Sequence, residues 1–202
     1  EYFRLVAKIP GSNNISYSRI PIIHSPRILS PRSAIELSFY RKPDFHLQID
    51  VESTEAKYAE LCCEFFYKEF DEIWTERSLI FMQKMDVFMP ENPSEHVNIH
   101  IYDDQFFNKL SKAFHADSDI YHKQFNYMIF TFTISDKFFN DYKSTYINAA
   151  DHDQNSYSNL SNAMGLFAVK RDVRFPEIRF DKQSLDSLCY GRFTKHLRFT
   201  NW

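Results

Sequence analysis

The chain has 202 residues, among them 21 Phe, 12 Tyr and three Gly, and its net charge is −3. A dinucleotide-binding fingerprint, a phosphate-binding loop and a nucleophile elbow each need closely spaced glycines, so the sequence excludes these three motifs. No run of Lys and Arg forms a basic stripe, and we expect no nucleic-acid partner.

The N-terminal segment is predicted to form a β-hairpin. Side chains alternate between two faces over residues 2–9, and residues 15–23 form a second extended run. The Pro-Gly-Ser-Asn-Asn sequence at 10–14 is typical of a turn. The two runs are therefore expected to lie side by side as antiparallel strands.

Prolines follow at five-residue spacing, at Pro21, Pro26 and Pro31. Proline lacks a backbone N–H and fixes φ, which favours an extended connector or an edge segment over a central strand. We therefore predict a Pro-containing connector and a domain boundary at 25–34, followed by a β-rich domain at 35–202.

The middle of the chain is predicted to be mostly β, because apolar residues alternate along several runs. One of these runs, residues 58–70, also fits a helical stripe, but its aromatic and cysteine content favours a strand. The expected strands cover residues 33–40, 45–51, 58–70, 78–89, 97–102 and 127–134. Short strands are expected later, at 165–169, 174–180 and 193–202.

Helices are predicted in the C-terminal half, where apolar residues recur every three or four positions. Asp103 or Asp104 is the expected N-cap of the first helix and Ser135 that of the second, while Gly191 is placed to end the third. The helices are expected near 103–115, 136–147 and 182–190. The predicted fold class is mainly β (α+β), an antiparallel sheet or β-sandwich with two or three inserted helices.

Two groups of histidines and carboxylates contain metal-ligand residue types without a recognised spacing. On a strand, His96 and His100 would lie about 13 Å apart, too far to share a zinc ion. The second group follows the first predicted helix and consists of His115, Asp117, Asp119 and His122. A solvated loop explains it better than a metalloenzyme site.

A third group has the opening ligand order of a calcium loop, with Asp151, Asp153 and Asn155 as weak candidates. Ser156 stands where such a loop needs Gly, and Asn162 where it needs Glu. We therefore expect no stoichiometric metal and no cofactor. No catalytic motif is present, which predicts that the protein is not an enzyme.

The three cysteines do not make a disulfide framework. Cys62 and Cys63 are adjacent and lie in an apolar run, which argues against a reactive thiolate. We expect buried thiols that act as small apolar residues, with a link from Cys189 to one of the other two as the open alternative.

Residues 157–167 carry a motif, Tyr-Ser-Asn-Leu-Ser-Asn-Ala-Met-Gly-Leu-Phe. It resembles the Y-x-N-I-x-N-G-x-G-I-F signature of a family of Bacteroidota cell-envelope lipoproteins of unknown function, often encoded beside TonB-dependent outer-membrane receptors. Ala163 departs from the signature at its first glycine. From the residues, the motif is a structural turn: Asn159 and Asn162 bond the local backbone, Gly165 permits positive φ, and Leu166 and Phe167 enter the core.

Weaker similarities to the same family lie at Phe139, Tyr142, 185–188 and 197–199. The resemblance implies that residues 1–24 are the C-terminal hairpin of an N-terminal β-sandwich domain. It also implies membrane attachment only through a lipid anchor on a longer precursor, and a place in the cell envelope at the outer membrane, on its periplasmic face or at the cell surface.

The function expected on this basis is a non-enzymatic module, an accessory or ligand-binding partner of an outer-membrane transporter such as a TonB-dependent receptor. The excess of Phe and Tyr favours a protein-binding surface, because both residue types are common at interfaces. The alternatives are a hydrolase or metal-dependent enzyme, marked by clustered ionisable groups with shifted pKa values in a pocket, and a structural or adhesion module.

Overall fold

The computed structural model describes residues 1–8, 10–11, 13–39, 44–52, 54–70, 76–87, 96–114, 122–148, 158–163 and 165–201. The strands are β1 (Tyr2–Lys8), β2 (Ile15–Pro21), β3 (Arg27–Ser30), β4 (Ile35–Leu37), β5 (Asp44–Asp50), β6 (Tyr58–Phe70), β7 (Glu76–Val87), β8 (Val97–Tyr102), β9 (His122–Ser135), β10 (Lys170–Arg174) and β11 (Ile178–Phe180). The helices are α1 (Asp103–Ala113), α2 (Lys137–Asn148), α3 (Lys182–Tyr190) and a 3-10 turn at Lys195–Leu197. The predicted mainly β fold with two or three helices is confirmed, and the number of α-helices is three.

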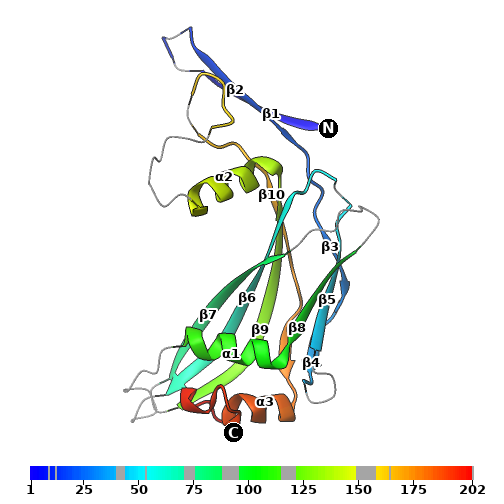
Figure 1. Ribbon diagram of the computed structural model, residues 1–202, viewed down its shortest axis with the longest axis vertical. Coiled ribbons are helices and arrows are strands. Elements are labelled where there is room, and N and C mark those ends of the chain that lie inside the picture. Colours follow the sequence, from blue (N-terminus) through cyan, green and yellow to red (C-terminus); the bar gives the residue numbers. More distant parts are fainter. Residues whose placement is uncertain are drawn as a thin grey trace.

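A twisted six-stranded sheet forms the body of the molecule (Figure 1). Its strands run in the order β4-β11-β9-β6-β7, and β10 pairs with one end of β9. The long strands β6 and β9 pair from Tyr58 opposite Ser135 to Phe70 opposite His122, with one bulge after Phe66. Every second side chain of β6 from Ala59 to Phe65 is buried, so the alternation in this sequence is that of a strand with one covered face.

The second layer is a three-stranded sheet, β3-β5-β8, together with helix α1. Leu47 and Ile49 of β5 are fully buried, and the ring of Phe45 lies 6.4 Å from that of Phe130 on β9. The two sheets therefore pack face to face in part. The strand β3 falls within the predicted connector at 25–34 and lies at the edge of its sheet, where prolines are tolerated.

Phenylalanine rings fill the space between the main sheet and α1. The fully buried Phe65 stands at the centre of this cluster. Its ring centroid lies within 6.5 Å of those of five other phenylalanines, Phe106, Phe114, Phe125, Phe180 and Phe199. These rings come from α1, β9, β11 and the C-terminal segment, so much of the aromatic excess is explained by the core.

One ion pair is buried beside this cluster. The carboxylate of Glu69 on β6 lies 3.9 Å from the ammonium of Lys123 on β9, and both residues are less than a tenth exposed. The Lys123 ammonium also donates to the carbonyl of Leu197 at 3.4 Å. The pair thereby ties the main sheet to the 3-10 turn near the C-terminus.

The helix caps differ from those predicted for α1 and α2. The N-cap of α1 is Tyr102, which makes no side-chain cap bond, and Asp103 is already inside the helix. Asp136, not Ser135, caps α2: its Oδ1 accepts from the N–H of Phe139 at 2.9 Å and its Oδ2 from the N–H of Val169 at 3.0 Å. Ser135 cannot do this, because it is still the last residue of β9.

Two predicted strands near the C-terminus are wrong. Residues 165–169 are irregular, and the strand begins only at Lys170, because 165–169 passes over the end of β9 as a loop. Residues 193–201 contain the 3-10 turn Lys195–Leu197 instead of a strand, and Arg198 adopts a left-handed φ of 61°. Only an isolated bridge from Phe199 to Lys123 remains of the expected pairing. No helix in the described ranges is long and apolar enough to cross a membrane.

Candidate functional site

The hairpin of β1 and β2 stands at the opposite end of the molecule from α3 and the C-terminus (Figure 1). Its register runs from Tyr2 opposite Pro21 to Lys8 opposite Ile15. Because side chains alternate between the two faces of a strand, this register sorts the hairpin into two faces. The inner face contains the buried residues Ser18 and Ile20, which join the hairpin to the body.

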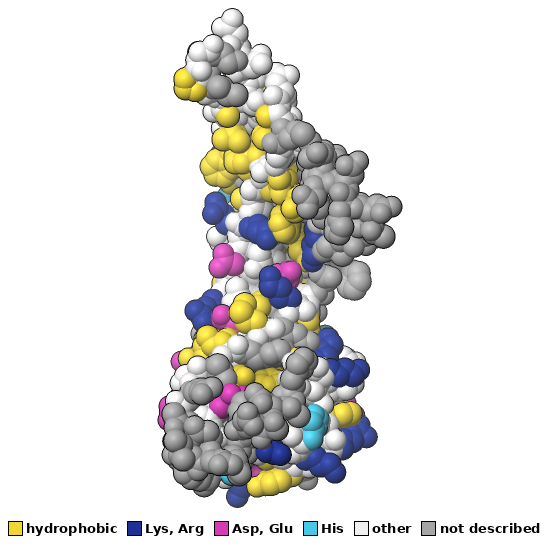
Figure 2. Space-filling model, turned by 90° about the vertical axis from the view of Figure 1, so that its left-hand side faces the viewer, with side chains coloured by type: hydrophobic (Ala, Val, Ile, Leu, Met, Phe, Trp, Pro, Cys, Tyr) yellow, Lys and Arg dark blue, Asp and Glu magenta, His cyan; other side chains and the backbone are white. Residues whose placement is uncertain are grey.

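The outer face of the hairpin, hereafter the docking face, is open to solvent. About half of the surface of Tyr2, Val6 and Tyr17 is exposed, at 54%, 53% and 51%. Its full membership is Tyr2, Arg4, Val6, Lys8, Ile15, Tyr17, Arg19 and Pro21, of which all but Pro21 are exposed. Figure 2 draws another side of the molecule, where hydrophobic side chains gather in the upper part without Lys or Arg among them.

The charge of the docking face is opposite in sign to that of the whole chain. It contains three cationic side chains, Arg4, Lys8 and Arg19, and no acidic residue, although the chain has a net charge of −3. The Arg19 guanidinium lies 3.8 Å from the ring centroid of Tyr2, and that of Arg4 lies 5.9 Å from the ring of Tyr17. These cation–π contacts hold the aromatic and cationic side chains together in one surface.

The turn at 158–167 is closed by the side chain of Asn159. Its Oδ1 accepts from the N–H of Phe167 at 2.8 Å, and its Nδ2 donates to the carbonyl of Phe167 at 2.5 Å. Gly165 adopts a φ of 145°, which only glycine takes without strain. Phe167 packs against the core, whereas Leu166 is half-buried at its edge.

The turn also braces the hairpin, which the sequence did not predict. Ser161 forms both a backbone and a side-chain bond to the carbonyl of Tyr17, at 2.9 and 3.1 Å, and its Oγ accepts from the N–H of Tyr17 at 2.9 Å. The amide of Asn162 donates to the carbonyl of Ile15 at 3.2 Å, not to its own turn as expected. The turn therefore covers the edge of β2 that faces away from β1.

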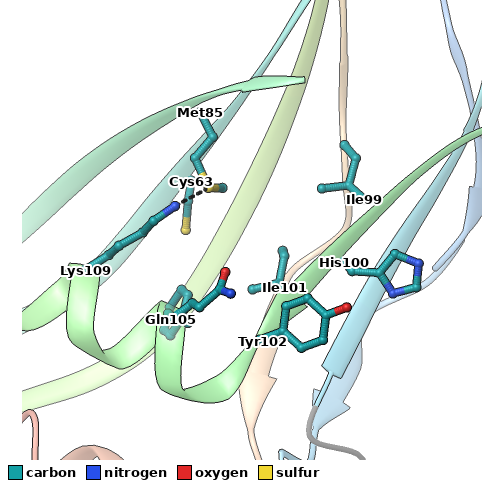
Figure 3. A pocket seen from close by; sticks show the side chains of 9 residues that line it. Cys63, Met85, Ile99, His100, Ile101, Tyr102, Gln105 and Lys109 are labelled. Atoms are coloured by element: carbon teal, nitrogen blue, oxygen red, sulfur yellow. Dashed lines mark hydrogen bonds between the residues drawn. The ribbon is translucent and has the colours of Figure 1, made fainter. Parts of the chain in front are cut away.

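A small pocket lies between α1, β7 and β8 (Figure 3). It encloses about 50 Å³, and the ammonium of Lys109 on its wall lies 3.6 Å from the sulfur of Met85. Ligand pockets usually measure roughly 300–1,000 Å³, whereas this volume suits about one or two water molecules. The pocket is therefore a packing gap beneath α1 and does not provide a substrate site.

A wider pocket of about 370 Å³ lies where β3, β4 and β5 meet. Asp44 and His46 line it, and Asp44 Oδ2 is 3.0 Å from Nδ1 of His100 on β8. The hydrogen bond from His100 lowers the pKa of Asp44. The carboxylate is thus held as an anion by its neighbour, which suits a surface ion pair better than a general base.

Of the metal-ligand groups considered from the sequence, the structure describes in full only the pair His96 and His100. His96 lies 3.5 Å from Asp50 while His100 faces Asp44, so the two histidines have separate carboxylate partners. His122 begins β9, and His115, Asp117 and Asp119 lie outside the described residues, as do Asp151, Asp153 and Asn155. Within the described ranges, no three His, Cys, Asp or Glu side chains lie close enough to hold a metal ion.

All three cysteines are free, so the alternative of a Cys189 disulfide is wrong. Cys63 and Cys189 are buried and Cys62 is half-buried. Burial raises the pKa of each thiol, that of Cys189 to about 11. Because the thiolate is the nucleophilic form, these thiols are poorly suited to nucleophilic catalysis at neutral pH.

Comparison of the chain with protein-family models, with curated proteins and with solved structures gives no match. The hairpin and the turn that braces it form the most distinctive surface among the described residues.

Proposed function

We propose that the protein is a non-catalytic docking module that binds another protein through the docking face of its N-terminal hairpin. The observation that carries the proposal is the composition of this face, where exposed tyrosines alternate with arginines on two paired strands. Tyr and Arg are enriched among the residues that dominate binding energy at protein interfaces. Val6 and Ile15 add further exposed apolar side chains to the same face.

The shape of the hairpin supports the same reading. A two-stranded sheet is at best marginally stable in water unless a third strand or another body covers it. Here the body buries Ser18 and Ile20 of the inner face and the turn covers one edge, but the docking face has no cover among the described residues. A bound partner would bury it.

A binding role is favoured over the hydrolase or metal-dependent enzyme considered from the sequence. The wider pocket contains a carboxylate with a lowered pKa, which is a weak base, and burial raises the pKa of all three thiols. Neither group has the activated form that acid–base or nucleophilic catalysis needs.

The cellular setting that we propose is the outer membrane of a Bacteroidota cell envelope, with a TonB-dependent receptor as the partner. This part of the proposal rests on the resemblance of residues 157–167 alone. The lipid anchor belongs to the same resemblance and would lie on a longer precursor. A structural or adhesion role would use the same docking face with a different partner.

Affinity purification of the tagged precursor from its native membrane, in mild detergent, tests the proposal. We expect an outer-membrane β-barrel protein in near-stoichiometric amount. The double variant Tyr2→Ser/Tyr17→Ser should lose it, whereas Tyr190→Ser, which removes a more exposed tyrosine from α3, should retain it. Recovery of the protein alone, or equal recovery by all three proteins, would contradict docking through this face.

A further inference from the structure

We infer that the partner docks by adding an acidic β-strand to the free edge of β1. This inference rests on the proposed docking function and specifies its mode and the chemistry of the partner. Its basis is the direction in which the backbone groups of β1 point, which follows from the hydrogen-bond pattern of the hairpin.

The hydrogen-bonded positions of the hairpin can be assigned from one bond. The N–H of Ile22 donates to the carbonyl of Glu1 at 3.1 Å, and these residues oppose each other one step beyond the pair Tyr2 and Pro21. In an antiparallel ladder, bonded and non-bonded pairs alternate. Phe3 and every second residue after it therefore direct their N–H and C=O groups toward β2.

The remaining residues of β1 direct these groups away from β2. They are Tyr2, Arg4, Val6 and Lys8. Two details of β2 agree with this assignment. Pro21, which has no N–H to donate, stands opposite Tyr2 at a non-bonded pair, and Tyr17 directs its own N–H to Ser161 on the far side.

The two edges of the hairpin are therefore treated differently. The turn at 158–167 occupies the edge of β2, through Ser161 and Asn162. In the part of the chain that the structure describes, no strand pairs with the edge of β1. An unpaired edge of this kind is a template for strand addition, in which backbone bonds give affinity and side chains on one face give specificity.

Charge selects the occupant of this edge. A strand paired with β1 would place alternate side chains on the docking face, directly beside Arg4 and Lys8. Acidic side chains there would face cations, whereas a second copy of β1 would bring no carboxylate to this face in any register. Opposite charges in directly opposed positions stabilise a strand pair, so the occupant is an acidic segment of another protein and not a second copy of this strand.

Peptide binding to the full chain tests this inference. The probe is a synthetic eight-residue peptide in which Glu alternates with Val or Tyr, and its control carries Lys in place of Glu. We expect the acidic peptide to bind at least about tenfold more tightly. On binding, amide exchange should slow at Arg4, Val6 and Lys8, and stay unchanged at Leu5 and Ala7, which already bond to β2.

Two variants of Val6 distinguish the contribution of its backbone N–H to peptide binding from that of its side chain. Val6→Pro removes the outward N–H without removing a bond to β2, and should abolish binding while Leu5 and Ala7 remain protected from exchange. Val6→Ala keeps the N–H and should still bind. Equal binding of the acidic and basic peptides would overturn strand addition. So would slowed amide exchange at successive residues of β1 in place of every second one.

The outcome is separable from that of the proposed function. Recovery of a β-barrel partner from membranes, together with failure of the acidic peptide to protect alternate amides, would contradict strand addition alone. Failure to recover any partner would contradict the docking function, whatever the peptide does.

Discussion

The side-chain amide of Asn159 bonds both backbone groups of Phe167, as a neighbouring strand would. Ser161, two residues after Asn159, bonds both backbone groups of Tyr17 in β2. One short turn thus anchors itself to the core and holds an edge of the hairpin 144 residues away. The position of the docking face depends on this chain of contacts.

Asn159→Ala is expected to lower the free energy of unfolding by about 1–3 kcal/mol. The variant removes two partly buried hydrogen bonds and leaves the N–H and C=O of Phe167 without partners. Urea denaturation measures the change. Asn126→Ala, at an exposed position of β9, is the control and should change stability by less than about 0.5 kcal/mol. Equal stability of the two variants would show that Asn159 does not lock the turn.

Gly165→Val is expected to cost a similar amount, about 1–3 kcal/mol, for a different reason. The φ of 145° is unfavourable for any residue with a Cβ, and a Cβ here would lie 3.1 Å from Cδ1 of Leu160. Thermal melting should show a lower midpoint. Amide exchange at Tyr17 should become faster, because the turn no longer holds β2. An unchanged midpoint would contradict the turn geometry.

Several of these relationships follow from the sequence, and others do not. The aromatic and cysteine content of 58–70 and the apolar run at 127–134 predict two strands, and the structure contains both within β6 and β9. The need for glycine at position 165 also follows from the spacing of turn residues. The bonds from Ser161 to β2 do not, because they join segments that are distant in sequence and use a small polar residue common in any loop.

The C-terminal segment shows a second limit. The apolar residues Phe193, Leu197 and Phe199 fit a strand as well as they fit an irregular segment. The structure buries Leu197 and Phe199 through a 3-10 turn, with Arg198 in the left-handed conformation between them. Local periodicity does not predict such a turn, because the turn is set by packing against the core around Phe65.

Glu69→Ala is expected to destabilise the protein by about 3–5 kcal/mol, because it leaves the ammonium of Lys123 buried without its carboxylate. Adding Lys123→Met should recover much of this loss by removing the second buried charge of the pair. Chemical denaturation of the single and double variants measures both effects. Glu52→Ala, which breaks an exposed pair with Arg27, should cost less than about 1 kcal/mol. Equal losses of unfolding free energy in Glu69→Ala and Glu52→Ala would contradict a stabilising role for the buried pair.

The pair of Asp44 and His100 predicts a pH dependence. The bond from His100 lowers the pKa of Asp44 below its ordinary value of 3.8, so the folded state favours the carboxylate. The stability gained is present above the ordinary value and is lost as the pH falls through the lowered one. In His100→Ala, NMR titration should show the pKa of Asp44 rising toward 3.8. His196→Ala, an exposed histidine far along the chain, should leave it unchanged.

The central claim is that the cationic and aromatic docking face binds a partner. The most direct test is the molar ratio of the outer-membrane β-barrel protein to the tagged precursor, measured by quantitative mass spectrometry after purification in mild detergent. For Arg4→Glu/Arg19→Glu the account predicts a fall of at least about tenfold, equivalent to about 1.4 kcal/mol of binding free energy. Arg179→Glu, an exposed arginine of β11, should stay within about twofold of the unmodified protein, because it lies outside the docking face. An unchanged ratio in the double variant, with the hairpin still folded, would contradict the claim.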